Sequence, residues 1–481
     1  MATTATPAAA APSSTAKPLT IRNYLAYAAG DFANNLTFSM AGMFLILYYT
    51  NVVGIEAAVI GTMFLVVRFI DAVTDLLAGR FVDTRRPGRL GKFKPFILVF
   101  ALPLLLSSMA IYSVRQFFPD ISTTQAIIYM YVSYILMGSV FYTLVNIPYG
   151  SMAPSMTQVP TERGKLATFR MYGAMSGMLF LAFIVGPQLR GTANDPELLQ
   201  QRLFTITAAF VVIGALLYGF LVWGTKEQVA RSPEPVSMKE SFGTLAKNTP
   251  LLLLSSSAVL YLTGMTALTT LGSYIAIYVQ QDAQFIAWNT LAQVGSLLVV
   301  GPLVPSIVRS VGKKTGYVAL ALITIAGAAV LAFAPLPTTP WWGLVAFFIM
   351  GLGINGVNTF MWACEADTVE YGEWKTGART EGTTYAVFSF TRKMGQALGG
   401  FIGGIALTVA GFNAGRASSG VDQAAGVADN IQLWAGGLVA LFSLLAALVM
   451  HFYPLTDQLY RKIVQEIADR RIAKEAASRG F

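Results

Sequence analysis

Long apolar runs separated by short polar stretches follow one another along most of the chain. A helix needs about 20 apolar residues to cross the hydrocarbon core of a bilayer. These runs are too long and too continuously apolar to be the alternating strands of a membrane barrel. The pattern therefore predicts twelve membrane-spanning helices, at residues 23–51, 55–80, 95–114, 123–153, 165–189, 203–224, 250–279, 285–309, 315–334, 340–366, 381–411 and 430–454.

The composition agrees with this pattern. Of the 481 residues, 55% are hydrophobic and only 12% are charged, whereas a soluble domain carries about 25% charged residues. Much of the apolar surface must therefore face lipid, and the expected fold is an all-α integral membrane protein. The chain has a single cysteine, Cys364, and a single histidine, His451, which argues against a disulfide framework and against a resident metal site.

Basic side chains gather in a few loops between the predicted spans. They follow spans two, six and eight and recur in the C-terminal tail, and the largest group is Arg80, Arg85, Arg86, Arg89, Lys92 and Lys94. Cytoplasmic loops of membrane proteins carry this excess of Lys and Arg. The net charge of +9 therefore indicates a multi-pass protein of the cell membrane with both termini in the cytoplasm, and no nucleic-acid partner.

A linker at residues 226–248, which contains Pro233 and Pro235, divides the predicted spans into two sets of six, at residues 21–225 and 249–455. The basic, glycine-containing loop after span two is echoed by Gly312-Lys-Lys314 after span eight. Matching loops in two equal halves predict two pseudo-symmetric six-helix bundles, the organisation of major facilitator transporters. Residues 1–20 are expected to be a disordered cytosolic arm.

The tail at residues 456–481 places Leu459, Ile463 and Ile467 four residues apart. This spacing predicts a short amphipathic helix against the cytoplasmic face.

Six charged residues interrupt the predicted spans: Asp31, Arg68, Asp71, Asp75, Arg170 and Lys393. Each charge at the centre of a membrane helix costs about 2.5–3.5 kcal/mol on insertion scales. These side chains must therefore pair with one another, face water or be neutralised by a ligand.

Arg68, Asp71 and Asp75 are spaced three and four residues apart, so they share one stripe of one helix. Two carboxylates one turn apart repel each other, and a bound cation or a shared proton relieves the repulsion. The hydroxyls of Thr74 and Thr143 would add oxygen ligands for a transient sodium ion. The alternative is a structural ion pair of Arg68 with one aspartate, which leaves the second carboxylate unexplained.

Two further features of the spans are informative. Pro148, within Asn146-Ile-Pro-Tyr149-Gly, predicts a break in span four, and broken helices line substrate sites in transporters. Asn146 and Tyr149 are therefore candidate substrate contacts, although an ordinary membrane-helix proline is the alternative. The glycines of span eleven predict close helix packing: Gly395, Gly399, Gly400, Gly403 and Gly404.

Four motifs resemble those of the glycoside–pentoside–hexuronide:cation symporters, the family of the melibiose permease. They are Arg68-Phe-Ile-Asp-Ala-Val-Thr-Asp75, Gly91-Lys-Phe-Lys-Pro95, Asn146-Ile-Pro-Tyr-Gly150 and Asp367-Thr-Val-Glu-Tyr-Gly-Glu-Trp-Lys-Thr-Gly377, the last followed by Arg379, Glu381 and Lys393. The resemblance implies a major facilitator fold with alternating access, and it extends from about Tyr24 past Lys393.

The resemblance also implies site roles. Asp71, Asp75 and Thr143 would hold the coupling cation, Asp31 and Arg170 would contact the sugar, and Lys393 would lie near both. A carboxylate and a guanidinium fork suit neighbouring sugar hydroxyls. Asn146 and Gly150 depart from the melibiose branch, which has an aspartate and a tryptophan there, so galactoside specificity is not implied. Thr74 replaces an asparagine, which leaves Na⁺ and H⁺ open as the coupling ion.

The expected function is symport of a sugar or glycoside with Na⁺ or H⁺ by a monomer that needs no other cofactor. A cytoplasmic gate is expected from Asp367, Glu370, Glu373 and Arg379, which would form breakable ion pairs with the loop after span two; solvated loop charges are the alternative. Two other functions stay open, namely transport of an amphipathic, lipid-like solute and a non-transporting membrane sensor. An enzyme is disfavoured, because glycosidase carboxylates flank the substrate from opposite sides.

Overall fold

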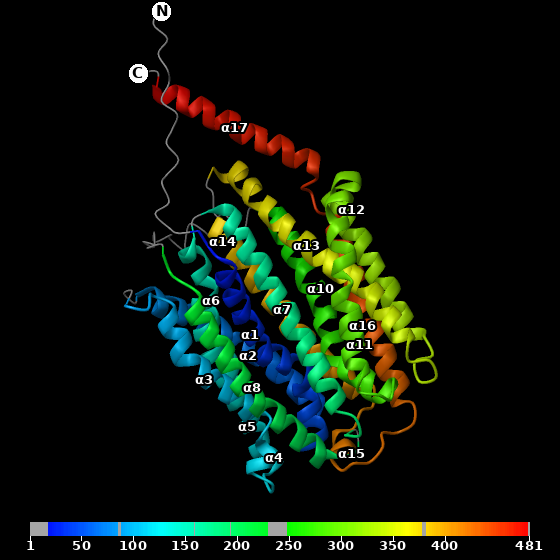
Figure 1. The fold of residues 1–481 in the computed structure, drawn as a ribbon. Helices are drawn as coiled ribbons and strands as arrows, with labels where there is room; N and C mark the ends of the chain where they lie inside the picture. The colour runs from blue at the N-terminus through cyan, green and yellow to red at the C-terminus, as the bar shows by residue number, and fades with distance from the viewer. Residues whose placement is uncertain are drawn as a thin grey trace, which may run out of the picture.

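The computed structural model describes residues 18–84, 88–157, 159–192, 194–228, 248–377 and 381–479, and nearly all of these residues are helical (Figure 1). Helices of the first half are α1 (Ile21–Tyr48), α2 (Ala57–Thr84), α3 (Lys94–Ile111), α4 (Val114–Phe117), α5 (Thr123–Tyr134), α6 (Thr143–Met156), α7 (Pro160–Gln188) and α8 (Pro196–Gly224). Two π-helical segments extend α1 and α5, and these are η1 (Tyr49–Val53) and η2 (Ile135–Tyr142).

The second half repeats this plan. Its helices are α10 (Thr249–Tyr274), which continues into the π-helical η3 (Ile275–Val279), and then α11 (Phe285–Gly295), α12 (Leu297–Phe333), α13 (Trp342–Thr376), α14 (Glu381–Val409), α15 (Ala414–Ser418) and α16 (Val427–His451). A last helix, α17 (Asp457–Arg479), follows. Most of the expected linker and arm, residues 229–247 and 1–17, lie outside the described residues.

All twelve expected spans are helical in the described part of the chain, which confirms the all-helical membrane fold. Nine helical stretches in that part are long and apolar enough to cross a membrane on those grounds alone. One of the nine, Phe285–Phe333, holds two expected spans, because the backbone turns at Gly312 (φ +80°) within α12. The other two expected spans, α2 and α14, carry charged side chains and are not among the nine.

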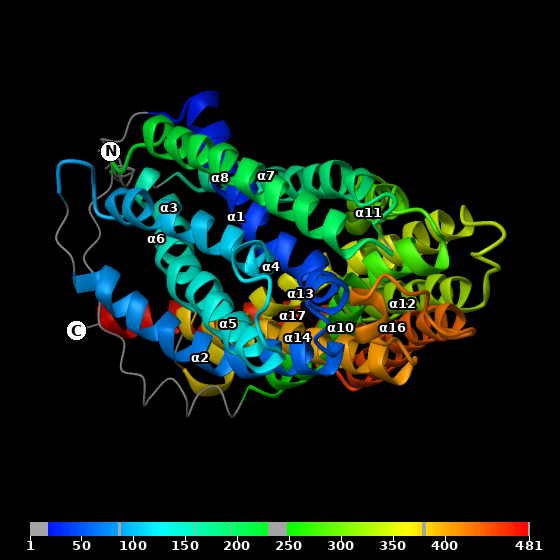
Figure 2. The same ribbon diagram turned by 90° about the horizontal axis from the view of Figure 1, so that it is seen from below.

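The two halves lie side by side, with α1–α8 on one side and α10–α16 on the other (Figure 2). Contacts between the halves include those of α2 with α14, α7 with α11, and α1 with α10. These are spans two and eleven, five and eight, and one and seven. This pairing is the one expected if the second half repeats the first, because each span then corresponds to the span six places later.

A partly buried carboxylate-to-backbone contact is repeated in the two halves. In the first half, Glu227, just after α8, accepts hydrogen bonds from the backbone N–H of Lys92, Phe93 and Lys94 at 2.7, 3.0 and 3.2 Å. In the second half, Asp457 accepts one from the backbone of Lys313 at 3.0 Å.

Each of these contacts depends on a glycine with positive φ. Gly91 has a φ of +97° and Gly312 a φ of +80°, and a Cβ at either position would meet the carboxylate at 2.5 Å or less. The echo between the two loops in the sequence is therefore a shared anchor, which ties the end of the sixth helix of each half to the loop after its second.

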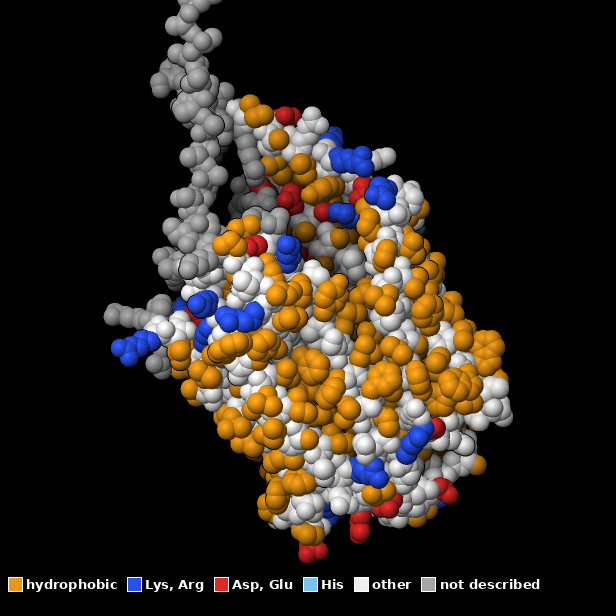
Figure 3. Space-filling view, in the orientation of Figure 1, with side chains coloured by type: hydrophobic (Ala, Val, Ile, Leu, Met, Phe, Trp, Pro, Cys, Tyr) orange, Lys and Arg blue, Asp and Glu red, His pale blue; other side chains and the backbone are white. Residues whose placement is uncertain are grey.

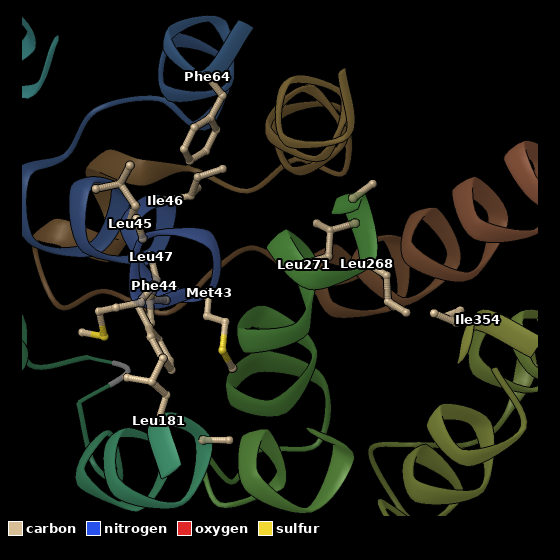
Figure 4. Packing of buried hydrophobic residues seen from close by; sticks show 14 of the residues in the cluster. Met43, Phe44, Leu45, Ile46, Leu47, Phe64, Leu181, Leu268, Leu271 and Ile354 are labelled. Carbon is tan, nitrogen blue, oxygen red and sulfur yellow. The ribbon is translucent and has the colours of Figure 1, made fainter. Parts of the chain in front are cut away.

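The packing of α14 explains its glycines. A Cβ at Gly399 would lie 2.6 Å from the carbonyl oxygen of Thr263 on α10, and one at Gly404 would lie 2.5 Å from that of Ala57 on α2. Close packing is thereby confirmed as the role of these glycines. Apolar side chains fill the space near the centre of the molecule, where Met43 of α1 points toward α10, which carries Leu268 and Leu271 (Figure 4).

The C-terminal helix α17 is amphipathic, as predicted. Ile463 and Ile467 are buried, and Leu459 packs partly against the core. The Trp374 indole of α13 donates a hydrogen bond to Glu466 at 2.7 Å, and Arg470 donates to the Trp374 carbonyl oxygen at 3.0 Å. We call the end of the molecule at which α17 lies the tail end, and the opposite end the distal end (Figure 1).

The halves are joined closely at the distal end. The Thr50 and Tyr274 hydroxyls lie 2.7 Å apart, and Asn51 donates to the Tyr278 hydroxyl at 2.5 Å. Further out, Arg190 pairs with Asp282 at 3.1 Å. At the tail end, by contrast, the surface is hollowed beneath α17, with charged side chains at its margin, whereas hydrophobic side chains cover the middle of the molecule (Figure 3).

Replacing Glu227 by alanine is expected to destabilise the first half, because several backbone N–H groups lose their acceptor. A loss of about 1–3 kcal/mol is expected, measured as a lower melting midpoint of the purified protein in detergent. Glu227→Gln keeps an acceptor oxygen and should lose less. Equal midpoints for the wild type and both variants would show that this anchor contributes nothing.

Candidate functional site

Asp71 is held within the first half of the protein. The Arg68 Nη1 lies 2.9 Å from the Asp71 Oδ2, and the Ser139 hydroxyl of η2 donates to the Asp71 Oδ1. Asp71 is only 8% exposed. Both of its oxygens therefore have partners, and the structural ion pair considered as an alternative for Arg68 is present.

Asp75 has partners from both halves. The Thr143 hydroxyl at the start of α6 donates to the Asp75 Oδ1 at 3.0 Å, and the Lys393 ammonium of α14 donates to the Asp75 Oδ2. The Asp75 and Lys393 side chains keep 28% and 41% of their surface exposed. This carboxylate therefore lies where the two halves meet, and it is more accessible than Asp71.

Thr74, predicted as a further oxygen ligand, is directed elsewhere. Its hydroxyl donates to the carbonyl oxygens of Ile70 and Asp71, at 3.1 Å in both cases. Ser139, which sequence reasoning missed, supplies the hydroxyl beside Asp71 instead. The signal was its position four residues before Thr143, since residues four apart share one face of a helix.

Span four is irregular, but not at Pro148. Helix α6 runs from Thr143 to Met156 through Pro148, so the break expected at Asn146–Gly150 is wrong in position. The irregular segment is η2, whose extra residue per turn precedes Thr143. Segments of π-helix occur frequently at functional sites, and this one carries Ser139, next to the Asp71 carboxylate.

The candidate sugar-contacting residues form a second cluster. The Arg170 Nε of α7 donates to the Asp31 Oδ2 of α1 at 2.6 Å, and the guanidinium lies over the Tyr149 ring, 5.0 Å from its centroid. Tyr149 stacks on Tyr27 with 4.7 Å between ring centroids. Arg170 remains 38% exposed, whereas Tyr149 is fully buried. Tyr149 thus positions Arg170 from beneath rather than reaching an open site itself.

A cavity of about 200 Å³ brings together six of the predicted site residues: Arg68, Asp71, Asp75, Thr143, Asn146 and Lys393. Beside it lies a second cavity of about 200 Å³, lined by Met43, Met178, Met265 and three threonines of α10. The two cavities share Phe38, Arg68, Tyr134 and Gln396. Both are lined by residues of both halves, and neither lining includes Asp31, Tyr149 or Arg170.

The expected gate residues lie at the tail end of α13. The Asp367 carboxylate pairs with Lys313 of α12 at 2.5 Å, and this partner belongs to the same half. Glu370 and Glu373 follow along α13 and are partly exposed, whereas Arg379 lies outside the described residues. The partner seen for Asp367 is therefore not the loop after span two.

Charged residues of the spans were overlooked, among them Arg392 and Glu365. Arg392 precedes Lys393 in the middle of α14 and is half-buried. Its Nη2 donates to the Asn358 Oδ1 of α13 at 2.9 Å, and its guanidinium lies 4.9 Å from the centroid of the Trp362 ring. A count of every charge in span eleven would have found it.

Two helical halves around a central polar cavity form the fold of the major facilitator type. Solved structures share this fold. A point mutant of the nucleoside transporter NupG superimposes with a TM-score of 0.65 at 14% identity, over 90% of this chain and 100% of that chain. At this identity the likeness shows the fold alone.

The chain belongs to the family described as MFS/sugar transport protein, whose profile matches residues 26–457. The resemblance to the sugar:cation symporters is thereby confirmed, and so is the expectation of a transporter rather than an enzyme. A relative in Escherichia coli (strain K12), the "Glucuronide carrier protein homolog", is 38% identical over 94% of this chain and 96% of its own length.

Other relatives span the whole chain in the same way. A "Putative sulfoquinovose importer" of Salmonella typhimurium is 34% identical over 94% of each chain. The "Isoprimeverose transporter" of Lactiplantibacillus pentosus is 29% identical over 94% of this chain and 92% of its own length.

The Arg68–Asp71 pair can be tested by its effect on stability. Asp71→Asn leaves the Arg68 charge uncompensated, and breaking a buried pair costs up to about 3–5 kcal/mol. The double variant Arg68→Gln/Asp71→Asn removes both charges and should melt at a higher temperature than Asp71→Asn alone. If the double variant loses as much stability as the two single variants together, the two side chains do not interact energetically.

Proposed function

We propose that the protein is a secondary active transporter that carries a sugar or glycoside together with a cation, Na⁺ or H⁺, by alternating access. The observation that carries the proposal is the position of Asp75. Its carboxylate lies in the cavity between the halves, with Thr143 of the first half on one oxygen and Lys393 of the second half on the other. A cation or a proton that binds Asp75 must therefore change a contact between the halves.

The Lys393 ammonium supplies the positive charge that a buried carboxylate requires. A coupling ion at Asp75 would take over this role and release Lys393, with Thr143 as a remaining oxygen ligand. Thr74 has no part in this site. The neighbouring Asp71 carboxylate is held by Arg68 and Ser139 and stays in place. The coupling ion would thus replace the Lys393 ammonium as the counter-charge of Asp75. The carboxylate would then be compensated throughout the cycle, which keeps the cost of its desolvation low.

The sugar site is proposed around Asp31 and Arg170, with Asn146 and Lys393 on the side of the cation cavity. A carboxylate accepts two hydroxyls and a guanidinium donates to neighbouring ones. The relatives' names support this class of solute, since they include a glucuronide carrier homologue and sugar importers. The Asp31–Arg170 pair also argues against a lipid-like solute, which has few polar groups to form hydrogen bonds with these two side chains.

The contacts at the distal end and the hollow at the tail end support an inward-facing state, with both termini in the cytoplasm. Asp367, Glu370, Glu373 and Arg379 would then lie at the cytoplasmic end of the pathway and act as its gate. The monomer is proposed to be sufficient for transport, because the central cavities are formed by one chain. Reciprocal coupling of ion and sugar needs about 1–3 kcal/mol.

The proposal is tested by uptake into proteoliposomes of galactosides, glucosides, pentosides and glucuronides. Each is measured with a sodium gradient, with a proton gradient and with neither. Accumulation of one sugar class against its gradient, driven by one of the two ions, would support symport. Movement of no sugar under any gradient would favour a membrane sensor and overturn the proposal.

Asp75→Asn is expected to abolish ion-driven accumulation of the transported sugar while leaving sugar exchange across the membrane, because the neutral amide takes up no proton and lacks the negative charge that attracts a cation. Uptake with a gradient and counterflow without one separate the two activities. Asp429→Asn, in the exposed first turn of α16, is the matched control. If Asp75→Asn still concentrates sugar as the wild type does, the assigned coupling role is wrong.

Arg170→Ala is expected to weaken sugar binding at least about tenfold, since hydrogen bonds to a charged group contribute about 1.5–3 kcal/mol. Arg202→Ala serves as a control, because the hydrogen bond seen for Arg202 joins it to Gln188, at 2.6 Å, near the distal end. Binding is measured by calorimetry on the purified protein. Unchanged affinity in Arg170→Ala would refute this placement of the sugar.

A further inference from the structure

One cation in the middle of the described helices has no anionic partner. Three others are paired with aspartates: Arg170 with Asp31, Arg68 with Asp71, and Lys393 with Asp75. No carboxylate among the described residues lies within ion-pair distance of Arg392, although Glu365 is buried on the neighbouring α13. The guanidinium of Arg392 is therefore not compensated directly by any carboxylate in the described part of the chain.

Arg392 has neutral partners instead. Besides the hydrogen bond to Asn358, its Nη1 approaches the Met361 sulfur at 3.4 Å, and its guanidinium lies over the rings of Trp362 and Phe388. Aromatic faces and an amide oxygen hold a guanidinium in place without neutralising it. Charged side chains inside a membrane normally pair with one another or mark the pathway of a substrate.

Arg392 lies next to the part of α14 that lines the central cavities, although neither lining includes it. Gln396, one turn further on, lines both central cavities, and the adjacent Lys393 lines the cation cavity. Residues four apart share a helix face, so Arg392 and Gln396 lie along one side of α14. Because Arg392 and Lys393 are adjacent in the sequence, the Arg392 backbone lies at the same depth along α14 as that of Lys393, the partner of Asp75.

An aromatic surface lies beside Arg392 on α13 and α14. Trp362 stacks on Tyr385 with ring centroids 5.7 Å apart, and Tyr385 is 55% exposed. The guanidinium of Arg392 lies over the Trp362 ring, 4.9 Å from its centroid. The second half thus presents an exposed aromatic side chain next to this cation.

We infer that Arg392 is a specificity-determining residue that binds an anionic group, a carboxylate or a sulfonate, on the transported sugar. This inference rests on the proposed sugar transport. The sugar ring would lie between the Asp31–Arg170 pair and the aromatic face of Trp362 and Tyr385. Its anionic group would supply the direct anionic partner that Arg392 lacks, and the planar guanidinium fork has the matching geometry.

The test uses three sugars that differ only at the exocyclic carbon: methyl α-D-glucoside, methyl α-D-glucuronide and methyl α-sulfoquinovoside. Binding to the purified wild-type protein at neutral pH is measured by calorimetry. At least one anionic sugar is expected to bind about tenfold to a hundredfold more tightly than the glucoside, as charged hydrogen bonds imply. Comparison of the two anions tells whether carboxylate or sulfonate is preferred.

Arg392→Gln keeps an amide that can face Asn358 but removes the charge. It is expected to abolish the preference for the anion while changing the affinity for methyl α-D-glucoside by no more than about twofold. Arg392→Lys keeps the charge without the fork and should retain part of the preference. Arg22→Gln is the matched control, because Arg22 also stacks on a tryptophan, Trp223, at 4.6 Å but lies at the start of α1.

The possible failures are distinguishable. A wild-type protein that binds the glucoside and both anions equally well would overturn this inference and leave the proposed sugar transport standing. The same holds if Arg392→Gln and Arg392→Lys both keep the full preference, or if Arg392→Gln weakens all three sugars equally. Binding and transport of no sugar by the wild type would overturn the proposed function, and this inference with it.

Discussion

The central constraint on this structure is charge compensation inside a membrane. In the pair between Asp75 of α2 and Lys393 of α14, the charge of one half of the protein is compensated by a charge of the other half. Neither charge is stable alone in an apolar medium, so the two halves are attached through the same groups that a coupling ion would bind. Asp71, satisfied by Arg68 and Ser139 within the first half, provides a fixed charge beside this exchangeable one.

Hydrophobic periodicity predicted the span positions and the all-helical fold well, because a continuous apolar run in lipid leaves the backbone few alternatives to a helix. It also predicted which residues approach the centre, since charges within spans are costly unless they meet there. The pairing of Asp31 with Arg170 joins α1 to α7 as the resemblance implied. The shared anchors at Glu227 and Asp457 were visible only as an echo of two basic loops.

Details of side-chain direction were beyond the sequence. Thr74 turns its hydroxyl back to its own helix, as threonines in helices often do, and the Ser139 hydroxyl of η2 lies beside Asp71 instead. Pro148 is accommodated without ending α6, so a proline rule based on soluble helices misplaced the irregularity. Asp367 pairs with Lys313 of its own half, a contact that spacing along the chain could not identify.

The π-helical segments η1 and η3 have a consequence for movement. They occupy equivalent places after the first helix of each half, and they carry Thr50, Asn51 and Tyr278, which close the distal end. Relaxing one such segment to regular α-helix would shift its register by one residue and turn the following side chains by about 100°. The contacts between the halves at the distal end thus depend on π-helical turns. A change of either segment to α-helix would separate Thr50 from Tyr274 and Asn51 from Tyr278 without bending the other helices.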